Sequence, residues 1–391
     1  MPCVLTLAQA LLLSCIIAAA RSGALPLPTL ALTSLVAAPL INNSTPGAAG
    51  ILYGFEGGAA WRDDRCGGGF RLSMTEMTGA PHWINTTLAL WSSPDGLSWA
   101  RTATLGRGSG NTNGTDWRSH LDAPMLVFNE SSGRYEMFYV AYWHGVPGCA
   151  ITSCNASLWR AVARAPGCAG LAGPYDDAGG GPFMTWTPPN AQAWEGNQGD
   201  DSFSPPVPAL GGGWLAAYGS SRVTAAGGRA WDAGMATAPS LAGPWARAPA
   251  GNGSAGSGIN PISDAIGGSV ENPLIYALPP GLAPPWAFVM VYDGLGGVEA
   301  ADAVGYSFSE DGLHWAPHQL LGLRPPAPAP APWFTSTRTP QGLVPTNGQP
   351  GEFYLFFTAQ PPGSAVPSPN GTFPYYAVGR ATVQLSARQP H

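Results

Sequence analysis

The chain has 391 residues, and all 17 of its basic Lys+Arg side chains are arginine. The absence of lysine excludes Schiff-base catalysis, a Walker phosphate-binding lysine and a lysine general base. With a formal net charge of −6 and only 10% charged residues, the chain lacks the basic surface of a nucleic-acid-binding protein. Glycine and proline are abundant (53 and 41 residues), yet 45% of the chain is hydrophobic and it has 15 Trp, which indicates a packed core with many turns.

The first residues resemble an export signal. Val4 to Ala20 is almost wholly apolar, and three alanines precede Arg21. This pattern predicts a signal peptide over residues 1–24 and a secreted protein whose residues 25–391 form a single domain. The segment before Val4 carries no positive side chain, so an uncleaved N-terminal membrane anchor is the alternative. No later stretch is long enough to span a membrane.

Export is also indicated by asparagine and cysteine usage. Four cysteines follow the leader, which allows two disulfides in three connectivities, and we expect them to close the loop between Cys149 and Cys168. Their spacing matches no zinc site. The N-x-Ser/Thr acceptor triplets, which predict a glycoprotein, begin at Asn42, Asn43, Asn85, Asn113, Asn129, Asn155, Asn252 and Asn370.

Short Val, Tyr, Phe, Trp and Leu runs alternate with turn residues through the remainder of the chain, which is typical of an all-β protein. One module recurs: a proline with an apolar strand, an aromatic strand, and a third strand that often ends in a Gly-Trp turn. Its prolines are Pro39, Pro124, Pro206, Pro273 and Pro340, separated by 85, 82, 67 and 67 residues. Five units too small to bury their own faces predict a five-bladed β-propeller of antiparallel three- to four-stranded blades. A β-sandwich is the alternative.

The later strands of each module also follow a pattern. In the first module the second strand is expected at Ile51–Phe55. The third strands of two modules end in the related turns Ser93–Trp99 and Ser309–Trp315, which share the pattern S-x-D-G-x-x-W. The glycine allows the hairpin dihedral and the tryptophan packs back on the sheet.

The innermost strand of each propeller blade borders the central channel, so residues at one register should meet there. Two positions before the module proline, these residues are Ala37, Asp122, Ser204, Glu271 and Arg338. Two carboxylates and an arginine suit a carbohydrate site, because a glycosidase needs one carboxylic acid and one carboxylate.

From about Ala38 to Leu385 the chain resembles the five-bladed propeller glycosidases, the clan of the arabinanase/β-xylosidase family (glycoside hydrolase family 43) and the invertase/levansucrase families. The resemblance lies in the blade layout, the two S-x-D-G-x-x-W turns and Glu271-Asn272-Pro273. It implies that Glu271 is the general acid. The family's base, an Asp before the first-blade proline, corresponds to Ala38, and its pKa-modulating Asp corresponds to Ser204-Pro205.

The resemblance and the register together give the expected site. The predicted catalytic residues are Glu271, Asp122 and Asp201, with Asp122 or Asp201 as base or modulator. The predicted substrate-binding residues are Arg338, Ser204, His120 and Asp200. Further first-blade carboxylates are Glu56, Asp63 and Asp64.

Structural roles are open for the same residues. Glu271 and Arg338 could pair with each other, and Asp122 could accept backbone N–H groups of its turn. Some members of the family that the chain resembles hold calcium near a last-blade histidine, but Arg338 stands there. No cofactor is therefore expected, and calcium is an alternative that no ligand set supports. The expected partner of this monomer is a carbohydrate. The function is therefore a secreted glycoside hydrolase or, if Ala38 marks a lost base, a non-catalytic carbohydrate-binding propeller.

Overall fold

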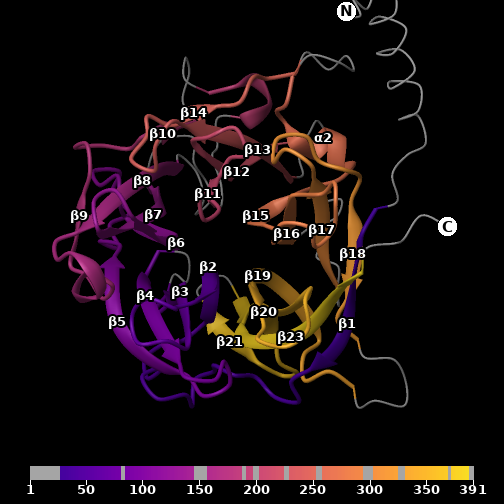
Figure 1. Cartoon of the computed structure of the whole chain (residues 1–391). Coiled ribbons are helices and arrows are strands. Elements are labelled where there is room, and N and C mark those ends of the chain that lie inside the picture. Colours follow the sequence, from indigo (N-terminus) through magenta and orange to yellow (C-terminus); the bar gives the residue numbers. More distant parts are fainter. Residues whose placement is uncertain are drawn as a thin grey trace, which may run out of the picture.

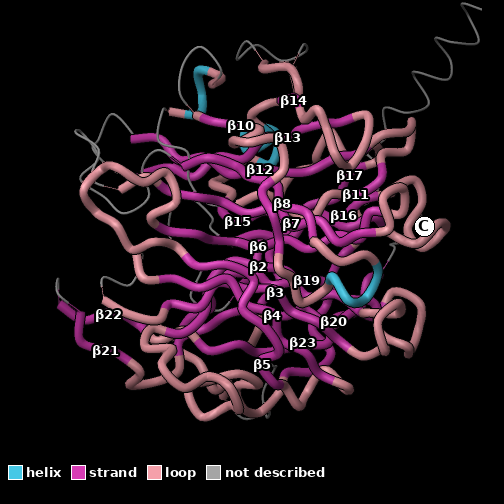
Figure 2. Tube along the Cα trace, turned by 90° about the vertical axis from the view of Figure 1, so that its left-hand side faces the viewer, coloured by secondary structure: helices cyan, strands magenta, loops and turns pink. Residues whose placement is uncertain are grey.

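The computed structural model describes residues 27–80, 84–144, 156–186, 191–196, 202–223, 229–251, 258–293, 303–324, 331–368 and 371–386. The expected leader, Cys149, Cys154, Asp200 and Asp201 lie outside these ranges. Five antiparallel sheets surround a central axis, which confirms the predicted five-bladed β-propeller (Figure 1). Strands make up nearly all of the regular structure in the side view (Figure 2).

Each blade has four strands in order from the axis outward, and blade 2 has one more. Blade 1 contains β2 (Gly54–Arg62), β3 (Phe70–Met77), β4 (Thr86–Ser93) and β5 (Ala100–Arg107). Blade 2 contains β6 (His120–Asn129), β7 (Arg134–Tyr142), β8 (Ala156–Ala163) and β10 (Met184–Thr185), with β9 (Tyr175–Asp177) also on β8. Blade 3 contains β11 (Val207–Pro208), β12 (Trp214–Val223), β13 (Arg229–Ala238) and β14 (Ala246–Arg247).

Blade 4 contains β15 (Glu271–Ala277), β16 (Phe288–Asp293), β17 (Ala303–Ser309) and β18 (Gln319–Gly322). Blade 5 contains β19 (Ser336–Pro345), β20 (Glu352–Gln360), β23 (Ala377–Ser386) and β1 (Thr29–Leu35). A hairpin of β21 (Ala365–Ser368) and β22 (Gly371–Pro374) extends from blade 5. The helical elements of the described residues are η1 (Gly167–Gly170), η2 (Ala193–Glu195) and α2 (Ile262–Ile266), and no described helix is long and apolar enough to cross a membrane.

The ring is closed by strands from opposite ends of the described residues. β1 is the outermost strand of blade 5 and pairs with β23 from Thr29↔Ser386 to Leu35↔Ala381. The backbone N–H of Leu30 also donates to the hydroxyl of Tyr306 in blade 4, at 3.2 Å. β1 therefore joins the last blade to its neighbour.

The first-blade register differs from the prediction. Ala37 and Ala38 are exposed in the connection from β1 to β2, and Ile51–Phe55 leads into the innermost strand instead of forming the second. The register that Asp122, Glu271 and Arg338 share beside the central channel is called the ring position below. In β2 the residue at this position is Glu56, 66 residues before Asp122. Blade 1 lacks the module proline because Gly57-Gly58 occupies that place. A Cβ on Gly58 would lie 2.0 Å from the carbonyl oxygen of Ser73.

Two turns and one disulfide fix the periphery. In the S-x-D-G-x-x-W turns the serine hydroxyls of Ser93 and Ser309 accept the N–H of the glycine three residues later, as the sequence predicts for tight hairpins. The disulfide joins Cys66 to Cys168 and so connects the β2–β3 turn to η1. The expectation that Cys168 closes the loop from Cys149 was wrong, because the fold brings Cys66 of blade 1 beside it.

Candidate active site at the propeller axis

A backbone irregularity accompanies the ring position in four of the innermost strands. Pairing registers shift at Glu56/Gly58, Asp122/Met125, Glu271/Leu274 and Thr337/Pro340. Ala123 and Asn272, which follow two of the ring carboxylates, have φ of 48° and 49°, a left-handed conformation that costs energy for residues with a Cβ. Bulges change the direction in which a side chain points and are common beside functional sites. The irregularities therefore mark the ring position as a candidate site.

Arg338 is the centre of the site. Its Nη2 donates to Glu271 Oε1 at 2.8 Å, and its Nη1 donates to Glu271 Oε2 at 3.0 Å. The same guanidinium lies 3.2 Å from Asp293 Oδ2 through Nη1 and 3.3 Å from Glu56 Oε1 through Nε. Glu271 and Asp293 come from paired positions of β15 and β16, whereas Glu56 comes from blade 1. Two carboxylates from blade 4 and one from blade 1 therefore surround the guanidinium of Arg338, which belongs to blade 5.

Burial changes the protonation of this cluster. The pKa of Glu56 is raised from 4.5 to about 7, because burial outweighs the lowering effects of Arg338 and the Thr339 hydroxyl and the charges of Asp122 and Glu271 act in the same direction as burial. Burial, followed by the charge of Glu271, also raises the pKa of Asp293 well above its ordinary value. One guanidinium does not balance three buried carboxylates, so the cluster holds protons near neutral pH.

Neutral side chains complete the cluster. The Thr339 hydroxyl donates to Glu56 Oε1. The Asn272 amide lies 3.4 Å from Asp293 Oδ2 and 3.5 Å from the Thr339 hydroxyl. Asn272, like Ala123, has a positive φ, so a strained residue takes part in the cluster.

Asp122 lies beside the cluster on the blade 1 side. Its Oδ1 accepts the Thr75 hydroxyl at 2.5 Å and the backbone N–H of Ala123 at 2.7 Å. Its Oδ2 is 3.9 Å from His120 Nε2, and His120 packs its ring against Tyr142 at 4.8 Å between centroids. Asp122 and His120 thus lie together, as the register predicted, and Asp122 also makes the backbone contact that was its structural alternative.

The other expected residues lie apart from the cluster or outside the described ranges. The hydroxyl of Ser204 is fully buried and accepts the backbone N–H of Ala217 within its own blade. Asp63 pairs with Arg71 at 2.9 Å and Asp64 with Arg62 at 2.8 Å, at the opposite end of β2 from Glu56. Asp200 and Asp201 are not described.

Sequence reasoning missed Asp293 and Thr339 and gave Glu56 too little weight. The spacing of 66 residues to Asp122 could have identified Glu56, since later ring residues are 67 apart. Asp293 is the last residue of β16 and pairs with Glu271 across the hairpin. Strand pairing was the signal that could have found it.

The described residues contain no group of three or more His, Cys, Asp and Glu side chains arranged to hold a metal ion. At the axis the position between the carboxylates is taken by Arg338. The chemistry that this arrangement can perform is proton transfer and electrostatic stabilisation by carboxyl groups in a largely dry site.

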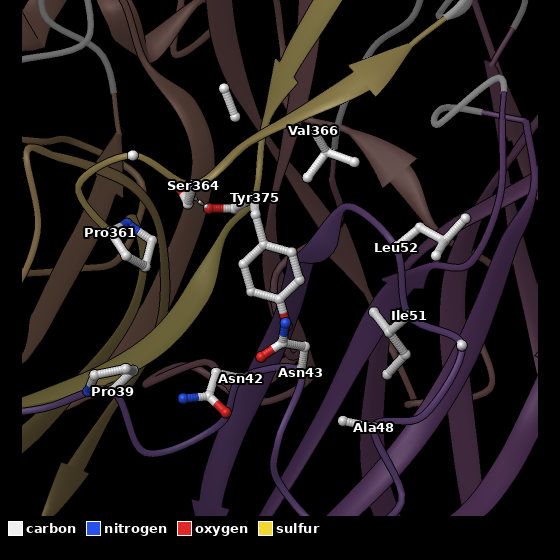
Figure 3. Close-up of a pocket in the computed structure, with 13 residues that line it drawn as sticks. Pro39, Asn42, Asn43, Ala48, Ile51, Leu52, Pro361, Ser364, Val366 and Tyr375 are labelled. Carbon is white, nitrogen blue, oxygen red and sulfur yellow. Dashed lines mark hydrogen bonds between the residues drawn. The ribbon is translucent and has the colours of Figure 1, made fainter.

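A cavity of about 620 Å³ opens between the β1–β2 connection and the segment that carries the β21–β22 hairpin (Figure 3). Its lining includes Asn42, Asn43, Leu52, Val366 and Tyr375. The cavity includes none of the ring residues, so it is separate from the carboxylate cluster.

Solved structures share this fold at low sequence identity. The protein BT0996, solved as an RGII complex, matches with a TM-score of 0.53 at 12% identity, and the match covers 92% of this sequence and 93% of the solved one. An exo-β-1,3-galactanase from Clostridium thermocellum matches with a TM-score of 0.53 at 11% identity, and one from Phanerochaete chrysosporium with 0.50 at 11%. These cover 88% and 89% of this sequence and 64% of each galactanase. No protein-family model and no curated protein matches the sequence. The resemblance to propeller glycosidases thus holds for the fold.

Proposed function

We propose that the protein is a secreted glycoside hydrolase that cleaves a polysaccharide or its oligomers with carboxyl groups at the propeller axis. The observation that carries this proposal is the convergence of Glu56, Asp122 and Glu271 from three innermost strands. Glu271 and Asp293 contact the same Arg338 nitrogen at 3.0 Å and 3.2 Å, so their separation is within the upper limit of about 9.5 Å for a glycosidase pair. The disulfide supports an oxidising, extracellular location.

The cluster suggests distinct roles for its members. Glu271 is the expected acid, but both of its oxygens accept hydrogen bonds from Arg338, so one must leave the guanidinium before Glu271 can donate a proton. Glu56, whose pKa of about 7 follows mainly from burial, is the second candidate for the acid. Asp122 is the candidate base, and Arg338 orients the substrate or the carboxylates.

A second candidate function is a propeller that binds carbohydrate without cleaving it. Ala38 no longer favours it, because the ring position of blade 1 is Glu56. The observation that does favour it is Arg338, which contacts oxygens of Glu56, Glu271 and Asp293 as a structural ion cluster does.

The test is an activity screen of the protein collected from culture medium, against β-1,3-galactan, arabinan, xylan and aryl glycosides, with Glu271→Gln, Glu56→Gln and Asp122→Asn in parallel. A lost general acid is recognised because activity on a dinitrophenyl glycoside, which needs no protonation, survives while activity on the polysaccharide falls. Activity that is unchanged in all three variants would refute the proposed site. If the wild type binds a polysaccharide but does not cleave it, the result would support the second candidate function, a propeller that binds carbohydrate without catalysis.

A further inference from the structure

The face of the propeller at which the innermost strands begin carries an exposed tryptophan pair. Trp117 is 49% exposed, and its ring stacks on Trp143 with 4.4 Å between centroids and 19° between planes. We propose that Trp117, supported by Trp143, is a sugar-stacking subsite that binds a pyranose unit of an oligosaccharide or polysaccharide reaching into the axial site. This inference rests on the proposed carbohydrate function and extends it.

The position of the pair follows from strand register. Trp117 precedes β6 by three residues and Trp143 directly follows β7, and His120 pairs with Tyr142 at that end of blade 2. Asp122 lies two residues into the same end of β6. The tryptophans and the candidate base therefore belong to the same face of the propeller.

The end of blade 2 that carries the pair belongs to a blade packed against blade 1. Tyr139 and Ala141 of β7 pack in one cluster with Leu88 and Leu90 of blade 1. Between the same two blades Thr75 of blade 1 binds Asp122 of blade 2. A glycan stacked on Trp117 can therefore extend along this end of blade 2 toward Asp122.

The backbone that carries the pair is held in place. The Ser119 hydroxyl donates to the Tyr142 carbonyl oxygen at 2.8 Å and accepts the His144 N–H at 2.9 Å. Asp116 accepts the Arg118 N–H at 2.8 Å. Because these hydrogen bonds already order the backbone around Trp117, a ligand that binds the indole loses little conformational entropy in ordering it.

A sugar ring suits this surface better than an apolar partner does. Among the large apolar side chains that are exposed in the described residues, Trp117 is the aromatic one; the others are Leu52, Leu97, Leu210 and Leu320. The negative face of an indole attracts the weakly positive C–H face of a pyranose, while the sugar hydroxyls remain in water. Within the described residues no other large apolar side chain that is exposed lies near Trp117 in the sequence, which fits such a ligand better than a protein interface.

The test is affinity electrophoresis through gels containing soluble β-1,3-galactan, arabinan or xylan. Glu271→Gln serves as the background to prevent digestion, and the variants are Trp117→Ala, Trp117→Phe and Leu210→Ala. Leu210 is the matched control, because it is an exposed apolar residue in the β11–β12 turn at the other end of an innermost strand. We expect the background protein to be retarded by at least one polysaccharide, Trp117→Ala to weaken its affinity about tenfold or more, Trp117→Phe less, and Leu210→Ala not at all.

The subsite would be overturned by no retardation by any of the polysaccharides, by retardation unchanged in Trp117→Ala, or by an equal loss in Leu210→Ala. Asn113 begins an acceptor triplet four residues before Trp117, so the protein's own glycan is a competing occupant. Binding that appears only after Asn113→Gln would identify that glycan on Trp117 and would also overturn the subsite. If the activity screen shows no hydrolysis but Trp117-dependent retardation persists, the catalytic proposal fails and the subsite stands.

Discussion

Arg338 of blade 5 holds both carboxylate oxygens of Glu271 of blade 4, through Nη2–Oε1 at 2.8 Å and Nη1–Oε2 at 3.0 Å. These residues occupy equivalent positions in adjacent modules, so the pair joins the two blades at the axis. The pairing is the structural alternative that the sequence left open. It is compatible with catalysis because bidentate arginine contacts also hold a carboxylate in one orientation.

Replacement of Arg338 should destabilise the fold severely. Arg338→Met leaves Glu56, Glu271 and Asp293 buried without their cation, so we expect a loss of about 3 to 5 kcal/mol in the free energy of unfolding at pH 8. Urea denaturation measures it. Arg164→Ala is the control, since its pair with Asp176 is exposed on both sides and solvent screening should leave its removal with little effect on stability. Equal losses in both variants would contradict the central role of Arg338.

Glu56 should make stability depend on pH. The unfolded chain releases this proton near 4.5, whereas burial keeps it on the folded protein up to about 7, so the folded state loses stability as the pH rises between those values. Glu56→Gln keeps the neutral form. Its free energy of unfolding relative to the wild type should therefore be higher at pH 8 than at pH 4.5, by on the order of 2 kcal/mol. A difference that does not change with pH would show that the pKa of Glu56 is the same in the folded and the unfolded protein.

Thr75 should position Asp122 for catalysis. Its hydroxyl donates to Asp122 and accepts the N–H of Ala123, so Thr75→Val removes both contacts at nearly constant volume. We expect kcat on the identified substrate to fall about tenfold with little change in KM. Thr75→Ser retains the hydroxyl and should retain activity. A similar loss in both variants would assign the effect to packing.

The disulfide should contribute substantially to stability because it closes a loop of 102 residues. Cys66→Ser and Cys168→Ser are each expected to lower the free energy of unfolding by about 2 to 5 kcal/mol. The double variant should lose no more than either single one, because all three break the same bond. Additive losses, measured by urea denaturation without reductant, would refute the pairing.

The sequence predicted the propeller because most blades repeat one local pattern. The prolines at 124, 206, 273 and 340 located four innermost segments and with them Asp122, Glu271 and Arg338. The prediction was wrong for blade 1 because Gly57-Gly58 stands there in place of the module proline, at a point where a side chain would clash with Ser73. The first module was therefore assigned to Pro39. Asp293 and the Cys66–Cys168 bond depend on strand pairing and blade packing, which local sequence does not encode.

The closure of the ring by β1 and β23 sets an order of events during synthesis. β1 leaves the ribosome before any other described strand, but its pairing partner is made roughly 340 residues later. At about 5 to 20 residues per second, β1 waits about 20 to 70 seconds with an unsatisfied backbone edge. During that interval four blades can assemble as an open arc. A nascent polypeptide arrested before Ala377 would therefore leave unpaired the edges of β1 and β20 that bind β23, and it would be a substrate for chaperones and proteases.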